Sequence, residues 1–261
     1  MTEEQTARHD GFRIETAAGV ARITLDVPGK FNRVSMPARD ELAQAFAELG
    51  RDASVRAIVL AGEGDAFTAG GDIAGFLQRE PEEVSRLAWN VAAPERCPKP
   101  VIARLHGYAF GVGLELALAC DFRIASSDLE IALPEIKLGM IPGSGGTQRL
   151  ARMVGLGRAK DIIMRGRRVS ADEALTLGLV TEVVPAADLD AAVQRLLDEL
   201  AELSPLALTT LKRVLNTAYD APLHVGLEIE GFAYGMLRSS HDFREGVEAF
   251  GEKRKPEFDG S

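Results

Sequence analysis

The run GVGLELALAC, at residues 111–120, constrains the fold of this chain more than any other stretch. A helix that is apolar on nearly every face must be buried almost all round, so we expect this segment inside the core of a globular domain. One carboxylate, Glu115, interrupts the run where a purely structural helix has no need of a charge. It falls about one turn into the helix, near free N–H groups and the positive end of the helix dipole. This position favours the ionised form and therefore the role of a base.

A second carboxylate, Glu135, follows a proline that ends the strand-like run LEIAL at residues 129–133. Its surroundings, LPEIKLGMIPGSGG, are rich in glycine and apolar residues, so desolvation is expected to raise its pKa and to favour proton donation. The alternative for both glutamates is structural, since a lone glutamate in an apolar segment is commonly paired with an arginine or extends to water. Two such groups beside glycine turns favour a catalytic pair.

The composition argues against several classes of protein. A net charge of −9 and a pI near 5.1 argue against a general nucleic-acid-binding protein, which needs basic patches. No stretch approaches the roughly 20 apolar residues of a membrane span, and the first ten residues lack the features of a signal peptide, so we expect a cytoplasmic enzyme without a membrane partner. Cys97 and Cys120 lack a CxxC partner and suit reduced thiols, so no metal site is expected.

The order of the expected elements indicates an α/β layered fold. Two short alternating strands are expected within residues 12–26, followed by a helix that Ser35 caps. A buried strand is expected within residues 55–62, and a single helix over residues 76–98, between proline boundaries.

The length allows one main domain with a smaller appendage. We assign residues 1–200 to a core that carries the site and residues 201–261 to a C-terminal helical region. Amphipathic helices in a segment of this size hold a poor core alone, so the region is expected to pack against the main body or another subunit.

Three runs carry a family resemblance: AFTAGGDI (66–73), HGYAFGVGLELALACDFRIAS (106–126) and LPEIKLGMIPGSGGTQRL (133–150). In order and spacing they resemble the signature of the crotonase family, the enoyl-CoA hydratases and isomerases. The resemblance extends from about residue 12 to the tail at 252–258. It implies a spiral of repeated ββα units with a C-terminal α-helical region, assembled as a homotrimer or homohexamer.

The same resemblance implies an activity. Hydratases of this family carry both acidic positions, and Glu115 and Glu135 occupy them, so the expected reaction is addition of water across the 2,3 double bond of an enoyl-CoA thioester. The backbone N–H groups of Gly71 and Val112 would form the oxyanion hole. Valine stands where the family usually has glycine, and its branched side chain crowds that position. Coenzyme A would be part of the substrate, so no separate cofactor is expected.

The resemblance also places residues around an acyl-CoA substrate. They are Lys30, Arg33, Val34, Ala66, Ala69, Asp72, Ile73, Pro142, Gly143, Phe250 and Lys253. Arg33 replaces a small residue of the family and would either contact a phosphate or point into water. For Lys253 the alternative is a solvated helix end. Trp89 is a candidate to line the acyl-chain pocket, with a core or subunit-contact aromatic as the alternative.

Other functions compete for the same residues. An enoyl-CoA isomerase or another crotonase-fold acyl-CoA enzyme would use only one carboxylate. A dinucleotide-binding dehydrogenase would use the glycines around HGYAFGVGLEL, but Glu115 would then lie beside a pyrophosphate. A serine hydrolase would need Ser144 in a GxSxG setting, which PGSGG does not provide. A non-catalytic acyl-CoA-binding scaffold would leave both carboxylates without a role.

Overall fold

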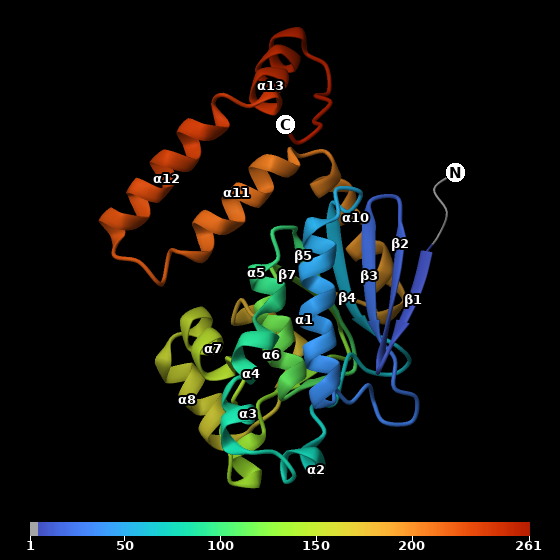
Figure 1. Cartoon of the computed structure of the whole chain (residues 1–261). Helices are drawn as coiled ribbons and strands as arrows, with labels where there is room; N and C mark the ends of the chain where they lie inside the picture. Colours follow the sequence, from blue (N-terminus) through green and yellow to red (C-terminus); the bar gives the residue numbers. More distant parts are fainter. Residues whose placement is uncertain (1–4) are drawn as a thin grey trace. The chain divides into compact units, whose positions relative to one another are not determined.

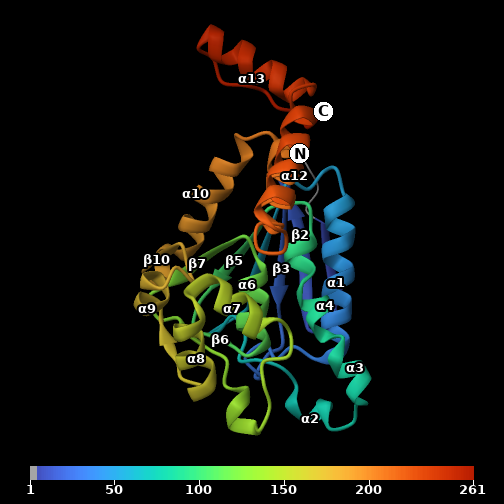
Figure 2. The same ribbon diagram turned by 90° about the vertical axis from the view of Figure 1, so that its left-hand side faces the viewer.

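The computed structural model describes residues 5–261, and Figures 1 and 2 show the chain in two views. These residues form two compact units. The first unit comprises residues 5–97 and 101–193, and the second comprises residues 98–100 and 194–261.

A seven-stranded sheet organises the first unit. Its order is β1 (Gln5–His9), β2 (Phe12–Ala17), β3 (Val20–Leu25), β4 (Ala57–Gly62), β5 (Val101–Leu105), β7 (Phe122–Ser126) and β10 (Glu182–Val184). The β1–β2 and β2–β3 pairs are antiparallel and the remaining pairs are parallel. The two strands predicted within residues 12–26 are confirmed as β2 and β3, which form a hairpin, and Ala18 and Gly19 at its turn both have positive φ. Every residue of β4 is buried, as its β-branched and apolar sequence predicts for a central parallel strand.

A smaller sheet completes the first unit beside the functional residues. It consists of β6 (Tyr108–Phe110), β8 (Glu130–Ala132) and β9 (Val169–Ser170) in that order. The β6–β8 pair is parallel, so the chain segments that immediately follow these two strands leave the sheet at the same edge. Those segments carry Glu115 and Glu135.

Helices cover the large sheet, and α1, α4, α5 and α6 lie on the same face of it (Figure 1). The helices of this unit are α1 (Met36–Arg51), α2 (Ile73–Phe76), α3 (Pro81–Ser85), α4 (Leu87–Val91), α5 (Ala93–Arg96), α6 (Val112–Ala119), α7 (Gly146–Val154), α8 (Leu156–Arg165) and α9 (Ala171–Thr176), with short 3₁₀ turns η1 (Glu135–Leu138) and η2 (Ala186–Asp188). Ser35 accepts a hydrogen bond from the N–H of Ala38 and so caps α1, as predicted. All eight residues of α6 are buried, as its apolar sequence predicts.

The prediction of one helix over residues 76–98 is wrong. The segment contains three short helices, α3, α4 and α5, that are separated at Arg86 and Ala92. Pro94 has no N–H to donate to the preceding turn, which explains the second break. At the first break, i to i+3 bonds from the N–H of Arg86 to Glu83 and from the N–H of Trp89 to Arg86 tighten the chain. Trp89 is 67% exposed, so the alternative interpretation of Trp89 as a core aromatic is also wrong.

The second unit is helical. It contains the greater part of α10 (Leu189–Ala201), together with α11 (Pro205–Asn216), α12 (Leu223–Leu237) and α13 (His241–Glu252). The segment 98–100 belongs to it because the Thr209 hydroxyl and the Lys212 ammonium group donate hydrogen bonds to the carbonyls of Pro98 and Lys99 (both 3.0 Å). No helix among residues 5–261 is long and apolar enough to cross a membrane.

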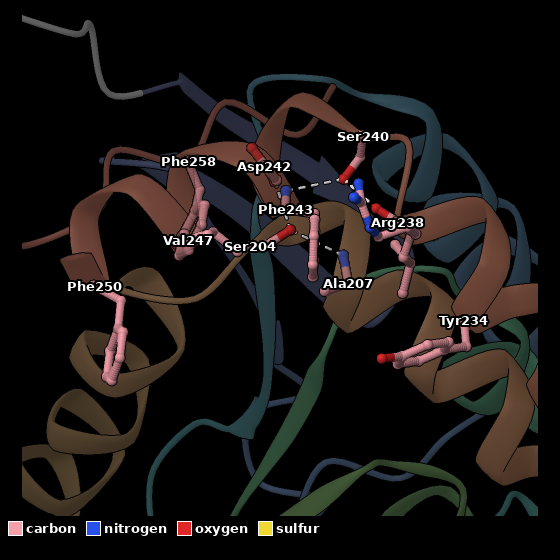
Figure 3. A pocket seen from close by; sticks show the side chains of 12 residues that line it. Ser204, Ala207, Tyr234, Arg238, Ser240, Asp242, Phe243, Val247, Phe250 and Phe258 are labelled. Atoms are coloured by element: carbon pink, nitrogen blue, oxygen red, sulfur yellow. Dashed lines mark hydrogen bonds between the residues drawn. The ribbon is translucent and has the colours of Figure 1, made fainter.

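A hollow of about 510 Å³ lies within the second unit, and Figure 3 shows the side chains around it. Its wall is mostly apolar and is formed by α12, α13, the beginning of α11 and the tail residue Phe258. The Ser204 hydroxyl donates to the buried carboxylate of Asp242 and accepts from the N–H of Ala207, and so ties the start of α11 to the start of α13. Large apolar side chains remain exposed along α12 in this unit, namely Leu223, Leu227, Phe232, Tyr234 and Met236.

Candidate active site

Glu115 is held in a fixed orientation inside the first unit. It is 2% exposed, and its own N–H donates to the carbonyl of Gly111 (3.0 Å) in the first turn of α6. Its Oε1 accepts hydrogen bonds from the N–H groups of Ser144 (2.7 Å) and Gly146 (3.0 Å). Two backbone donors stabilise the ionised form of a buried carboxylate. The described residues offer no hydrogen-bond partner to Oε2, which leaves this oxygen available to a substrate or a water molecule.

Gly146 is required for this arrangement because there is no space for a side chain. A Cβ at this position would lie 3.0 Å from Cγ and from Oε1 of Glu115, and 3.0 Å from Cδ1 of Leu133. Contacts this short are rare in proteins, so the carboxylate would have to move. The glycine-rich turn PGSGG therefore brings backbone donors to within hydrogen-bond distance of Glu115.

Glu135 occupies a different electrostatic environment. It begins the η1 turn, directly after Pro134. The pKa of Glu135 is raised to about 7, mainly by burial and to a smaller extent by the negative charge of Glu115, while a backbone hydrogen bond and the charge of Arg39 partly offset the rise. Its Oε2 is buried without a hydrogen-bond partner among the described residues. A carboxyl group with a pKa near 7 is present in both protonation states at neutral pH and can donate a proton.

Gly111 lies close to both glutamates. It has φ of 53°, which favours glycine, and its carbonyl accepts the N–H of Glu115. A Cβ at Gly111 would lie 2.9 Å from Oε1 of Glu135. Both glutamates therefore approach the backbone of a single glycine.

Two backbone N–H groups near the carboxylates have no acceptor. Neither Gly71 nor Val112 donates a hydrogen bond to any residue in the range 5–261. The Gly71 loop is fixed by a parallel bridge to Val34, with bonds from the N–H of Val34 to Gly70 (3.0 Å) and from the N–H of Asp72 to Val34 (3.3 Å). Val112 is the first residue of α6, where an N–H has no partner within the helix. Free N–H groups on a fixed backbone are suited to stabilise a developing oxyanion.

Arg39 belongs to this site, although it was not among the residues selected from the sequence. It is 4% exposed, and its Nη1 donates to the Ser144 hydroxyl (3.3 Å). Burial lowers the pKa of Arg39, while the charges of Glu115 and Glu135 raise it. The sequence did contain a signal, because Arg39 lies three positions before Leu42 on the apolar face of α1, where a charge is unexpected.

The remaining predicted substrate-binding residues of the first unit are of three kinds. Lys30, Ala69, Ile73 and Gly143 are exposed, whereas Val34, Ala66 and Pro142 are buried. Arg33 forms an ion pair with Asp72 (3.3 Å), and the choice between a phosphate contact and exposure to water stays a prediction. In the second unit, Phe250 is 87% exposed and Lys253 ends α13 in a left-handed conformation.

Asn32 is a further residue that sequence reasoning missed. Its amide nitrogen donates to the carbonyls of Glu63 and Ala66 (both 2.8 Å), and its amide oxygen accepts the N–H of Val27 (3.1 Å). It is buried and has a positive φ. It joins the loop after β3 to the loop after β4, and thus supports the backbone on both sides of the Val34–Gly71 bridge.

A mixed α/β fold with one buried and one half-buried carboxylate, the second with a raised pKa, and two free backbone donors is suited to an enzyme that moves protons next to a polarised carbonyl. The family model described as enoyl-CoA hydratase/isomerase matches residues 15–261, and the chain belongs to this family.

Individual relatives match over nearly the whole chain. It is 39% identical to the YngF protein of Bacillus subtilis, a protein assigned to the enoyl-CoA hydratases/isomerases, over 92% of this chain and 95% of that protein. It is 35% identical to the short-chain-enoyl-CoA hydratase of Clostridium acetobutylicum, over 94% of this chain and 95% of that protein. The crystal structure of an enoyl-CoA hydratase from Bacillus anthracis matches with a TM-score of 0.91 and 37% identity, covering 96% of this chain and 100% of that chain. The dehydrogenase and serine-hydrolase alternatives are therefore set aside.

Proposed function

We propose that this protein is an enoyl-CoA hydratase that adds water across the 2,3 double bond of an enoyl-CoA thioester. The observation that supports this most strongly is the contrast between its two carboxylates. Glu115 is buried and accepts two backbone hydrogen bonds, whereas burial raises the pKa of Glu135 to about 7. Pairs of titratable groups with divergent proton affinities divide the roles of base and acid.

The proposed reaction starts with a water molecule at Oε2 of Glu115. Glu115 takes a proton from the water as its oxygen bonds to Cβ of the substrate. The electron pair of the double bond moves toward the thioester, and the thioester oxygen gains negative charge. Glu135 then donates its proton to Cα, so that one water molecule is added in total.

The backbone donors account for the stability of the charged intermediate. The N–H groups of Gly71 and Val112 would both point at the thioester oxygen, without reorganising during the reaction. Removal of one such donor costs about 10²- to 10³-fold in kcat where it has been measured in other enzymes. Val112 retains its N–H, so we expect the valine to restrict the space for the acyl group more than the charge stabilisation.

The direct test is a hydration assay on a panel of enoyl-CoA thioesters with uncharged acyl chains. The loss of the enone absorbance measures the rate. The proposal predicts turnover of at least one member and formation of a 3-hydroxyacyl-CoA product. Migration of the double bond without uptake of water would support an isomerase instead. Binding of the thioesters without turnover of any kind would support the non-catalytic scaffold.

The proposed substrate contacts follow from the same function. We assign the CoA moiety to Lys30, Arg33 and the backbone at Val34, Ala66, Ala69, Asp72 and Ile73, with Pro142 and Gly143 beside the acyl group and Phe250 and Lys253 as further CoA contacts. The reaction requires neither a metal nor a cofactor, because CoA is part of the substrate. The compartment we propose is the cytoplasm, as expected for a chain with two cysteines that suit reduced thiols.

A homotrimer or homohexamer is the assembly we propose. Large apolar side chains are exposed along α12, and the hollow within the second unit is lined mostly by apolar groups. Exposed apolar surface of this kind is typical of protein contacts. The region 201–261 would then serve oligomerisation.

A further inference from the structure

Arg39 carries a positive charge that the surrounding protein leaves largely unsatisfied. A guanidinium group has five N–H donors, and the only hydrogen bond that the Arg39 side chain makes among the described residues is the one to the Ser144 hydroxyl. Its Nε is buried and has no partner within residues 5–261. No carboxylate in that range forms an ion pair with it, although Glu115 and Glu135 attract it through space. Buried guanidinium groups are normally paired, so this one is suited to receive an anion.

The position of the guanidinium group indicates where that anion would bind. Its Nη2 lies 2.6 Å from the place where a Cβ on Gly71 would be, so it packs directly against the loop whose N–H would hold the thioester oxygen. On its other side it contacts Ser144, whose N–H holds Glu115. The Phe76 ring lies 5.3 Å from the guanidinium carbon and covers it. The positive charge therefore lies against both the Gly71 loop and the Ser144 turn, next to the proposed site of reaction.

We propose that Arg39 binds a carboxylate at the far end of a short acyl chain, so that the preferred substrates are enoyl-CoA thioesters of dicarboxylic acids. This inference rests on the proposed hydratase function. A guanidinium group matches a carboxylate by two parallel hydrogen bonds, which fix its orientation as well as its charge. A neutral chain would leave the buried donors unpaired, and a site built in this way rejects such an analogue strongly.

A substrate carboxylate also fits the electrostatics of the catalytic pair. The site carries one positive charge on Arg39 and one negative charge on Glu115, while Glu135 titrates near neutral pH. An additional anion next to Arg39 would favour the protonated form of Glu135, which is the form that donates a proton to Cα. The hydration itself is unchanged: the water oxygen bonds to Cβ, Cα gains one proton, and the distal carboxylate takes no part in bond making.

The experiment compares two five-carbon substrates that differ at the far end of the chain. Glutaconyl-CoA ends in a carboxylate and trans-2-pentenoyl-CoA ends in a methyl group. We expect the wild-type enzyme to favour glutaconyl-CoA by about 10²-fold or more in kcat/KM. Arg39→Met should lose about 10²-fold or more on glutaconyl-CoA and clearly less on pentenoyl-CoA, so that the preference for the carboxylate disappears. Arg39→Lys, which keeps the charge but not the fork, should show an intermediate loss.

Arg51→Met serves as the control, because Arg51 is exposed at the end of the same helix. It should leave both activities unchanged. Equal losses of Arg39→Met on both substrates would overturn the proposal and make Arg39 a positioning residue that supports Glu115 through Ser144. A wild-type preference for pentenoyl-CoA would also overturn it, and this comparison needs no variant to fold. Failure of the wild-type enzyme to hydrate either substrate would contradict the hydratase function itself.

Discussion

The raised pKa of Glu135 predicts a measurable penalty on folding that the substitution Glu135→Gln removes. Burial raises the pKa of this carboxyl group from 4.5 to about 7, so the folded state holds a proton that the unfolded state releases. Stability therefore falls as the pH rises from the unfolded value through the folded one. A change of this size corresponds to about 3 kcal/mol in full, which solvent around a half-buried group reduces to about 2 kcal/mol. Slightly more than half of that, about 1 kcal/mol, falls between pH 5.5 and pH 8.

The assay is urea unfolding of the wild-type protein and of Glu135→Gln at both pH values. Glutamine keeps the shape of the side chain but has no titrating proton, so the contributions of most other groups cancel in the comparison. We expect the wild-type protein to lose about 1 kcal/mol more stability than the variant on going from pH 5.5 to pH 8. An equal loss in the two proteins would show that burial does not raise the pKa of Glu135. A larger loss in the variant would show that the sign of the argument is wrong.

Three further outcomes are expected. Gly71→Pro should lower kcat by at least about 10²-fold relative to Gly71→Ala, because both introduce a Cβ near Arg39 but only proline removes the N–H. Val112→Gly should be tolerated. Equal activity of the proline and alanine variants in the hydration assay would place the oxyanion hole elsewhere. Gly146→Ala should displace the Glu115 carboxylate and lower kcat by about 10-fold or more. Gly157→Ala is the control and should leave kcat unchanged, because no atom lies within 4 Å of a Cβ added at Gly157. Unchanged steady-state kinetics for Gly146→Ala would contradict the tight contact with Glu115. Light scattering should give three or six times the 28.0 kDa of one chain, and a stable monomer at micromolar concentration would refute the proposed assembly.

Much of the fold was predictable from local patterns. The buried helix α6 follows from its apolar sequence, the β2–β3 hairpin from alternation around Ala18 and Gly19, and the start of α1 from Ser35. The segment over residues 76–98 was not predictable in the same way. Its apolar spacing fits one helix, but Pro94 interrupts the hydrogen bonding, and the break at Arg86 has no comparable sequence signal.

The candidate site was predictable only in part, because it depends on residues that are distant in the sequence. Glu115 and Glu135 are unusual in their local surroundings, so the sequence alone made them candidates. The donors that hold Glu115 lie on the turn at Ser144 and Gly146, and no local pattern indicates that contact. Arg39 reaches Ser144 across 105 positions, and it could have been suspected only as a charge on an apolar face.

The central claim is that both carboxylates are required for hydration, and one comparison tests it most directly. Glu115→Gln and Glu135→Gln are assayed for hydration and for exchange of the substrate α- and γ-protons with deuterated solvent. Glutamine keeps the shape and removes the proton function, so each variant should lower kcat for hydration by about 10² to 10⁴ with little change in KM. An enzyme of the isomerase type would keep proton exchange in Glu115→Gln and lose it only in Glu135→Gln. Hydration at the wild-type rate by Glu115→Gln would contradict the account and leave Glu135 as the single working carboxylate.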